Sequence, residues 1–393
     1  MILLKKEFVK LGELYNITSG GTPSRKNNLY YEKGTIPWIK TGDLKKMYIS
    51  EASEYITQLG LENSSAKMFP KGTVLLAMYG ATIGNSSILN IDAATNQACA
   101  AFLPDNRIKP EFLYYYLNRI KNKLVALGVG GAQPNISISI LKGIEIPLLT
   151  LNEQEKIVSL LNKSRALIEK RQAQIAALDE LTQSVFIEMF GDPVTNPNGW
   201  EIVDLKEIAE YFIGLTYKPN DVSDEGIVVL RSSNIQNGVI DLNDIVRVKK
   251  EVNDKLCVKQ NDILMCSRNG SARLVGKVAL IPELEEKMTF GAFMTIIRSE
   301  YYNYLYNYFQ NIAFRRQITS GATTTINQIT KKMLDSIRLP LPPMSLQNEF
   351  AHKVEQIQYN KKILQTSLLE LNNLYNALIQ KAFKGELFHD NLM

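Results

Sequence analysis

Short polar loops recur along this chain, and their side chains are of the types that bind nucleic acid. The candidate contact residues are Thr22, Ser24, Arg25, Lys40, Thr41, Tyr79, Gln133, Tyr217, Lys218, Arg231, Ser232, Asn234, Arg268, Asn269, Arg273 and Thr324. Guanidinium, ammonium, hydroxyl and amide groups supply the donors and acceptors that proteins use on base edges and phosphates. The same residue types also build ordinary turns. The whole set therefore indicates more than any one of its members.

Motifs that would give the chain a catalytic centre of its own are incomplete. Residues 270–277 resemble a phosphate-binding loop, but the glycines lie one residue too far apart, and Val278 stands where Ser or Thr would hold magnesium. Residues 196–199 read Asn-Pro-Asn-Gly, without the second proline and the aromatic residue that hold a target adenine in adenine methyltransferases. Only two histidines occur, His352 and His389. We therefore expect no catalytic residue, no metal site and no cofactor in this chain.

The composition describes a globular and weakly basic chain. Its 393 residues predict two or three domains, and the net charge of +5 is compatible with nucleic acid but too small to establish it. No apolar run reaches the roughly 18 residues that span a bilayer, and the N-terminus lacks the order of a signal peptide. Cys99, Cys257 and Cys266 form no CxxC pair. These features predict reduced thiols, a cytoplasmic location and no membrane partner.

Landmarks in the first half of the chain recur about 193 residues later. Residues 144–148, with Gln154 after them, align with residues 337–341, with Gln347 after them. Residues 38–44 likewise align with 229–235, and 71–76 with 260–265. Because solenoid units span only about 20–50 residues, this period indicates a duplicated domain. Two similar domains suit a ligand with near two-fold symmetry, such as duplex DNA. The polar loops match in position but differ in chemistry, as two readers of different sequences would.

Each copy ends in a segment with the heptad spacing of a coiled coil. The first seam passes through Ile157, Leu161, Ser164, Ile168, Arg171, Ile175, Leu178, Thr182, Val185 and Met189. The second passes through Phe350, Val354, Ile357, Lys361, Leu364, Leu368, Leu371, Tyr375, Leu378 and Ala382. Helices of about 40 residues would be about 60 Å long. We expect the two helices to pair antiparallel; the alternative is two amphipathic helices, each packed on its own domain. The polar seam positions either set the register or mark where a partner subunit packs.

Mixed α and β structure is predicted for the segments that position the polar loops. Apolar strands are predicted at 74–78, 98–103, 227–230, 262–265 and 294–297, and a tyrosine-rich helix over 301–318. The predicted fold class is α/β (mixed α+β), duplicated, with the copies joined by two long helices that form an antiparallel coiled coil. The predicted domains are residues 1–150 and 193–343, with a first spacer helix over 151–192 and a second over 344–388.

The ordered set of motifs resembles the specificity subunit of type I restriction–modification systems. The resemblance is carried by Leu11-Gly12-Glu13-Leu14, residues 19–24, residues 36–44, residues 143–147 with 153–157, Gly191-Asp192-Pro193 with Gly199-Trp200, and residues 382–387. It covers essentially the whole chain. The first copy lacks the tryptophan that Trp200 supplies to the second, and the second copy replaces Thr-Gly-Asp of the first with Ser232-Ser233-Asn234.

The resemblance implies two target-recognition domains separated by an antiparallel helical spacer. Each would read one half of a split target in double-stranded DNA, with an unread gap set by the spacer length. Two modification (methyltransferase) subunits would carry S-adenosylmethionine, and restriction subunits would use ATP and magnesium. This chain would thus direct methylation and cleavage without performing either. Two rival classes remain: a stand-alone two-domain DNA-binding regulator, and a methyltransferase fused to its reader, against which the missing methyl-transfer motifs argue.

Overall fold

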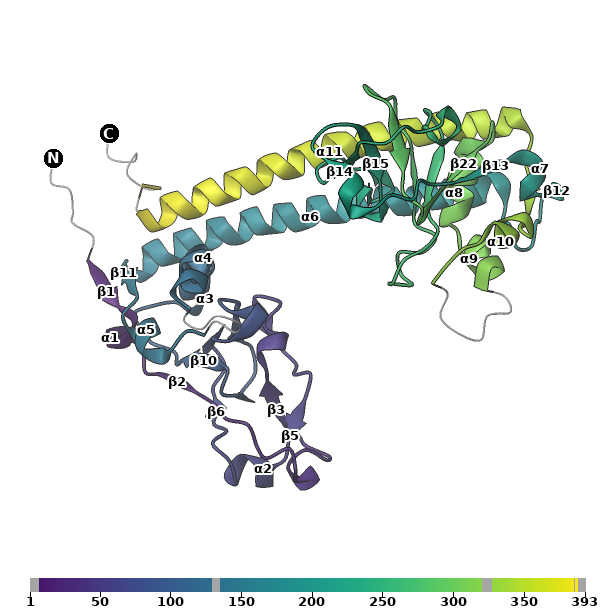
Figure 1. The fold of residues 1–393 in the computed structure, drawn as a ribbon. Coiled ribbons are helices and arrows are strands. Elements are labelled where there is room, and N and C mark those ends of the chain that lie inside the picture. Colours follow the sequence, from purple (N-terminus) through teal and green to yellow (C-terminus); the bar gives the residue numbers. More distant parts are fainter. Residues whose placement is uncertain (1–6, 129–134, 320–326, 385, 388–393) are drawn as a thin grey trace. The chain divides into compact units, whose positions relative to one another are not determined.

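The structure, a computed structural model, describes residues 7–128, 135–319, 327–384 and 386–387. The chain divides into two compact units: unit 1 comprises residues 1–172 and 366–393, and unit 2 comprises residues 173–365. Each unit combines one globular copy of the duplication with a stretch of both long helices, α6 (Leu151–Phe190) and α11 (Met344–Lys384) (Figure 1).

The globular part of unit 1 contains a five-stranded sheet and a four-stranded sheet. The first has the order β2 (Ile17–Ser19), β10 (Cys99–Phe102), β7 (Val74–Ala77), β8 (Ser86–Leu89) and β4 (Tyr48–Ile49). The second has the order β5 (Tyr55–Ile56), β3 (Ile36–Ile39), β9 (Ala93–Thr95) and β6 (Met68–Phe69). A two-stranded pair joins β1 (Phe8–Lys10) to β11 (Glu145–Pro147). The helices are α1 (Leu11–Leu14), α2 (Gln58–Glu62), α3 (Pro110–Arg119), α4 (Lys121–Leu127) and α5 (Ile138–Lys142), with 3-10 turns η1 (Asn28–Tyr30), η2 (Thr41–Asp43) and η3 (Gly80–Thr82).

Unit 2 repeats this plan with two four-stranded sheets. The first has the order β13 (Glu210–Ile213), β22 (Met294–Arg298), β19 (Ile263–Cys266) and β20 (Val278–Leu280). The second has the order β14 (Val222–Ser223), β18 (Arg247–Val248), β15 (Ile227–Leu230) and β21 (Met288–Phe290). Two pairs join β12 (Glu201–Asp204) to β23 (Arg338–Leu341) and β16 (Ile235–Gln236) to β17 (Val239–Ile240). The helices are α7 (Leu205–Ile208), α8 (Tyr302–Gln310), α9 (Ile312–Thr319) and α10 (Lys331–Asp335), with 3-10 turns η4 (Pro219–Asp221), η5 (Ser232–Asn234) and η6 (Asp254–Leu256).

The strand pairing confirms the predicted duplication. The order β2-β10-β7-β8 corresponds to β13-β22-β19-β20, and the parallel pair β3 and β9 corresponds to the parallel pair β15 and β21. Strands β7 and β19 are buried at every position, which explains their continuous apolar runs, because both faces of these strands are covered. The mixed α/β fold class predicted from the sequence is therefore correct.

The tyrosine-rich helix predicted over 301–318 is wrong in one respect, because α8 and α9 are separate helices. Asn311 lies between them with an extended ψ of 154°. Its side-chain Oδ1 accepts a hydrogen bond from the backbone N–H of Ala313 at 2.9 Å. An asparagine that satisfies a free N–H in this way favours the start of a new helix over the continuation of the old one.

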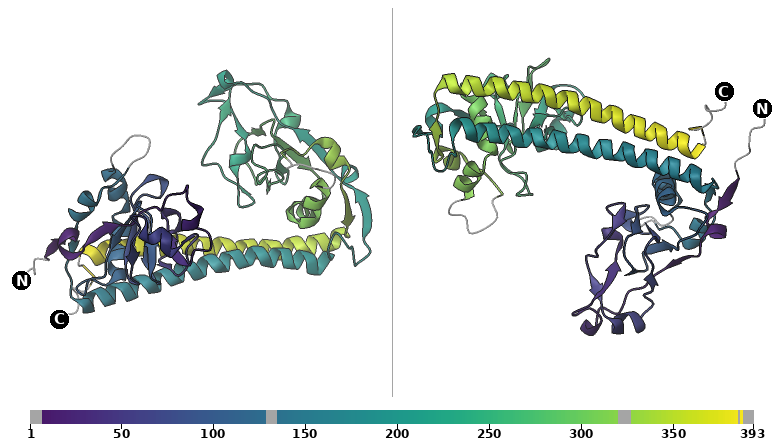
Figure 2. Two further views of the ribbon diagram at one scale, coloured as in Figure 1. Left: turned by 90° about the horizontal axis from the view of Figure 1, so that it is seen from below. Right: turned by 180° about the vertical axis from the view of Figure 1, so that it is seen from behind.

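Within each unit, the beginning of one long helix lies beside the end of the other (Figure 2). In unit 1, Ile157 and Leu161 of α6 share a buried cluster with Ile379 and Phe383 of α11. In unit 2, Phe186 and Phe190 near the end of α6 pack on Phe350 near the start of α11, with ring centroids 5.7 and 5.0 Å apart. The helices therefore pair antiparallel, as the seams predicted.

Polar residues of the seam have partners inside the helix pair. Lys361 is 8% exposed, and its ammonium group forms an ion pair with Asp179 of α6. The Thr182 hydroxyl donates to the carbonyl of Leu178 at 3.1 Å. Because Lys361 reaches across to one specific carboxylate, a slip of one helix along the other would leave a buried ammonium unpaired. This ion pair supports the register-setting interpretation of Lys361.

Candidate nucleic-acid interface

Strand register brings the polar loops of unit 1 to one end of its sheets. Ser19 pairs with Ala100, Ala77 pairs with Cys99, and Ile39 pairs with Thr95. The segments that follow β2, β3, β7 and β9 therefore emerge side by side. We call residues 20–25, 40–43, 78–82 and 96–98 the loop end of unit 1. It contains the candidate residues Thr22, Ser24, Arg25, Lys40, Thr41 and Tyr79.

Unit 2 has an equivalent loop end, formed by residues 214–218, 231–234, 267–273 and 291–293. Here Ile213 pairs with Thr295, Cys266 pairs with Met294, and Leu230 pairs with Phe290. It contains the candidate residues Tyr217, Lys218, Arg231, Ser232, Asn234, Arg268, Asn269 and Arg273. The remaining two candidates, Gln133 and Thr324, lie outside the described residues.

Glycine lets the first loop pass close to the neighbouring strand in both units. A Cβ atom at Gly20 would lie 2.0 Å from the carbonyl oxygen of Thr95, and one at Gly214 would lie 2.3 Å from that of Gly291. No other residue fits such an approach without a backbone shift. In unit 1, the indole N–H of Trp38 also donates to the carbonyl of Gly21 at 3.0 Å. These contacts hold the loop that carries Thr22, Ser24 and Arg25 against the end of β3.

The turn after the central parallel strand is the same in both units despite its different sequence. The backbone N–H of Lys40 donates to Asp43 Oδ2 at 2.8 Å, and that of Arg231 donates to Asn234 Oδ1 at 2.9 Å. The replacement of Asp43 by Asn234 thus preserves the turn. Asn234 is 1% exposed, and its amide also donates to the carbonyls of Asp241 and Asp244. All of its hydrogen bonds lie inside unit 2, so Asn234 positions the turn rather than presenting its own side chain to solvent.

Two basic candidates of unit 1 meet at a carboxylate that sequence reasoning did not single out. Glu54 Oε2 accepts hydrogen bonds from Arg25 Nη2 at 2.9 Å and from Lys40 Nζ at 2.8 Å. These cations lower the pKa of Glu54 to about 2, with the Arg25 hydrogen bond as the largest cause. The Arg25 guanidinium also lies 4.3 Å from the ring centroid of Tyr31. Glu54 lies just before β5, so only the pairing of β5 with β3 brings it here.

Candidate residues of unit 2 also meet across separate loops. Asn269 Nδ2 donates to the Ser232 hydroxyl at 3.2 Å, and Arg231 Nη2 donates to Asp244 Oδ2 at 2.9 Å. Arg268 lies with its guanidinium 5.6 Å from the ring centroid of Phe293, which is 59% exposed. Sequence reasoning missed Phe293; an aromatic residue in the turn between two buried strands was the signal that could have found it.

Tyr79 and Arg268 occupy equivalent places in the two units. Each forms an isolated bridge with a residue that follows an undescribed segment, Asn135 for Tyr79 and Gln328 for Arg268. The carbonyls of the preceding residues, Met78 and Ser267, accept hydrogen bonds from the backbone N–H groups of Ile136 and Ile329. An exposed phenol in one unit therefore corresponds to an exposed guanidinium in the other.

Three of the unit 2 candidates are less closely integrated. Tyr217 packs against the cluster of Leu215, Val229 and Val248, and Lys218 immediately precedes η4 with an exposed side chain. Arg273 is exposed and makes no hydrogen bond or ion pair with the rest of the described chain. Arg273 is thus free to move toward a ligand, whereas Tyr217 is partly occupied by packing.

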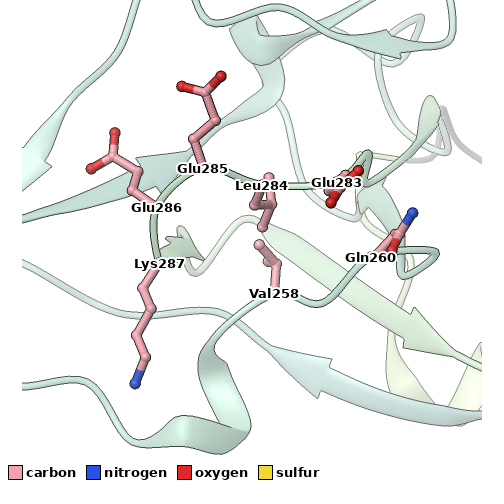
Figure 3. Close-up of a pocket in the computed structure, with 7 residues that line it drawn as sticks. All are labelled: Val258, Gln260, Glu283, Leu284, Glu285, Glu286 and Lys287. Atoms are coloured by element: carbon pink, nitrogen blue, oxygen red, sulfur yellow. The ribbon is translucent and has the colours of Figure 1, made fainter.

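A hollow whose lining includes three glutamates lies at the opposite end of unit 2. Residues 281–287 connect the end of β20 to the start of β21, and residues 283–287 line this shallow hollow together with Val258 and Gln260 (Figure 3). The carboxylates of Glu285 and Glu286 extend away from the apolar contact of Val258 with Leu284 (Figure 3). Carboxylates repel phosphates, so this hollow does not suit a nucleic-acid backbone. Among the residues with described structure, no group of three or more metal-ligating side chains occurs, and no helix is long and apolar enough to cross a membrane.

Comparison with known proteins gives consistent matches over nearly all of the chain. A family model described as the type I restriction modification DNA specificity domain matches residues 4–178 and again residues 197–373. The chain is 26% identical to the specificity subunit of the type I restriction enzyme MjaIX from Methanocaldococcus jannaschii, over 96% of this chain and 92% of that protein. It is 29% identical to the StySPI specificity subunit of Salmonella potsdam, over 91% of this chain and 84% of that protein.

Solved structures share the fold. One chain, from a study of complex assembly and conformational transition of the type I R-M system, matches with a TM-score of 0.65 and 20% identity, over 98% of this chain and 100% of that chain. The S subunit of a type I restriction-modification system from M. genitalium matches with a TM-score of 0.51 and 17% identity, over 98% of both chains.

The chain has two equivalent loop ends, one in each unit, and two long helices that pair with each other. This combination is that of a recognition protein with a duplicated domain. The chain belongs to the family of type I restriction–modification specificity subunits. It is accordingly the sequence-specific DNA-recognition subunit of such a system, and not one of its catalytic subunits.

Proposed function

We propose that residues 1–150 and 193–343 are the two target-recognition domains, and that each binds one half of a split DNA target through its loop end. The observation that carries this proposal is the recurrence of one loop end with two different sets of exposed side chains. A shared frame with different contacts suits an asymmetric target in double-stranded DNA. The side chains proposed for contact are Thr22, Ser24, Arg25, Lys40, Thr41, Tyr79 and Gln133 in the first domain. In the second they are Tyr217, Lys218, Arg231, Ser232, Arg268, Asn269, Arg273 and Thr324.

In this proposal, the spacer helices, residues 151–192 and 344–388, set the unread gap and bind two modification subunits. Support comes from Leu181 of α6, 44% exposed, and Leu374 of α11, 55% exposed, which are equivalent in the duplication. Each unit therefore presents an exposed leucine on its helix pair, as two identical partners require. The partners would carry S-adenosylmethionine for methylation, and restriction subunits would carry ATP and magnesium. Because the target is chromosomal and invading DNA, the proposed location is the cytoplasm.

Co-expression with the neighbouring modification gene, followed by methylation mapping of the cellular DNA, tests the proposal. The expected result is one motif with two defined halves and a fixed undefined gap. The purified chain alone should neither methylate DNA, nor cleave it, nor hydrolyse ATP. DNA binding that is unaffected by the modification subunit, with no methylated motif, would instead favour the stand-alone regulator.

Partner docking is tested separately by Leu181→Glu and Leu374→Glu. A charge in an apolar interface is strongly unfavourable, so each variant should lose one of two modification subunits and the double variant both. Co-purification followed by mass measurement of the complex reads the number of bound subunits. Leu29→Glu, at a 63% exposed leucine in the globular part of unit 1, is the matched control. Full assembly of the double variant would show that the partners dock elsewhere.

A further inference from the structure

In both units, a carboxylate holds the basic side chain that begins the turn after the central parallel strand. Lys40 and Arg231 are equivalent, since each donates its backbone N–H to the side chain three residues on. Lys40 pairs with Glu54 at 2.8 Å, and Arg231 pairs with Asp244 at 2.9 Å. Both carboxylates come from the segment that leads into the antiparallel neighbour of that strand, β5 or β18.

The two carboxylates do not occupy equivalent positions. The backbone carbonyl of Glu54 accepts from Trp38 N, whereas the corresponding acceptor for Val229 N is Val246, two residues beyond Asp244. Duplication alone therefore does not explain the pairing, because each unit builds it from a different residue. A feature that recurs from non-equivalent residues points to a shared requirement at the loop end.

Unit 1 holds its cations more firmly than unit 2. Glu54 binds Lys40 and Arg25 together, and its side chain is only 24% exposed. Arg25 is further confined, with its guanidinium 4.3 Å from the Tyr31 ring and 5.1 Å from the Trp38 ring. The Asp244 side chain is 72% exposed, but the Asn234 amide fixes its segment by donating to its backbone carbonyl at 2.8 Å.

Arg231 is not fully satisfied in its pair. Its Nε–H is buried and lacks a hydrogen-bond partner among the described residues. An unpaired buried donor is unfavourable. A guanidinium that leaves Asp244 for acceptors on DNA can pair this donor as well, so the observed state is suited to exchange.

Phosphates are present on every DNA, whereas the correct base edge is present only at the target. A carboxylate at the loop end competes with phosphates for the basic side chains and also repels the backbone. We propose that Glu54 and Asp244 are specificity-determining positioning residues, which hold the basic side chains of their loop ends until the correct base edge displaces them. This inference rests on the proposed function and assigns the suppression of non-target binding to two named residues.

The test uses Glu54→Gln and Asp244→Asn in the full chain bound to its modification subunits. Affinity is measured over a range of salt for the methylated motif and for duplexes altered in either half. Glu54→Gln removes the ion pairs with both Lys40 and Arg25, so it should bind duplexes altered in the first half at least about two- to fivefold more tightly, the range for a single surface ion pair. The log–log salt dependence should steepen by up to about one unit for each cation that is freed. Asp244→Asn should have the same effects on the second half only.

Asp105→Asn and Glu286→Gln are the matched controls. They make the same charge change and release Arg107 and Arg247, which lie outside the loop ends. Controls that leave discrimination unchanged while both test variants relax it in their own halves support the inference. Test variants that act no more than the controls, or that weaken target and non-target binding equally, would overturn it.

Thermal unfolding of each variant is compared with that of the parent. If Glu54→Gln does not fold, Asp244→Asn decides the outcome, because its carboxylate is mostly exposed. A parent complex that methylates no split motif would refute the proposed function itself. A parent with a split motif and variants with unchanged discrimination would refute only the role of the two carboxylates.

Discussion

The loop ends of units 1 and 2 share a frame and differ in the chemistry that the frame presents. Lys40 corresponds to Arg231, and Tyr79 corresponds to Arg268. Phe293 fills a place that Ala98 holds in unit 1, since their carbonyls accept from the equivalent N–H groups of Ser267 and Met78. Unit 2 therefore exposes a guanidinium and a phenyl ring where unit 1 exposes a phenol and a small side chain.

The difference shows how recognition can change while the fold stays constant. The turns are held by backbone N–H groups and by one short side chain, which is Asp43 in one unit and Asn234 in the other. Buried strands supply the rest of the frame, as β7 and β19 show. Most side chains at the loop ends, unlike Asn234, are not needed to hold the turns and can therefore diverge.

Exchange of a whole globular part should have the largest effect. Replacing residues 1–150 with the first domain of another family member should change one half of the methylated motif completely and leave the other half intact. The reason is that each loop end is built entirely within its own unit. Methylation mapping measures the result. A change in both halves, or in neither, would contradict the assignment of one half-motif to each unit.

Lengthening of the paired helices should change the gap and not the halves. Because Asp179 pairs with Lys361, seven residues inserted after Leu178 should be matched by seven after Lys361 to keep the seam aligned. The insertion adds about 10 Å of helix, or about three base pairs at 3.4 Å each. Methylation mapping should show both half-motifs retained with a new gap. An active variant with its original gap would mean that the helices do not set the spacing.

Truncation of the buried aromatic cores should show whether the units unfold separately. Phe186, fully buried, packs on Phe190, Tyr304 and Phe350, so Phe186→Ala should destabilise unit 2 by about 3–5 kcal/mol. Phe112→Ala, next to Phe383, is the matched change in unit 1. Hydrogen exchange in denaturant reports each unit by its own amides. Equal loss of protection in both units from either variant would show that they unfold together.

Much of the architecture could be predicted from the sequence because it depends on local periodicity. The alternating steps of three and four through Ile168, Arg171, Ile175 and Leu178 predict a helix seam, and the short apolar runs at β7 and β19 predict buried strands. The positions of the loops follow from glycines and polar turns between these elements. The duplication repeats the heptad seam in both copies, and two equivalent seams made the pairing of the long helices predictable.

Features that depend on strand pairing were not predictable from one sequence. Glu54 reaches Lys40 only because β5 pairs with β3, and the burial of Asn234 depends on the segment at 241–244. The sequence shows Phe293 as an aromatic residue in a turn, but only strand pairing places that turn at the loop end. The break between α8 and α9 is a further case, because it depends on the hydrogen bond that the Asn311 side chain accepts from the backbone N–H of Ala313.

The smallest expected effects separate base reading from phosphate binding inside unit 2. Arg268 is held over Phe293 at the loop end, so Arg268→Ala should lose about 1–3 kcal/mol of discrimination at one base pair of the second half. Arg273 has no partner in the described chain, and Arg273→Ala should instead flatten the log–log salt dependence by about one unit without changing the motif. Competition binding with singly altered duplexes, repeated at several salt concentrations, measures both quantities. If the two variants changed salt dependence alike and neither relaxed any base pair, Arg268 would be a phosphate contact, and the difference between Tyr79 and Arg268 would carry no sequence information.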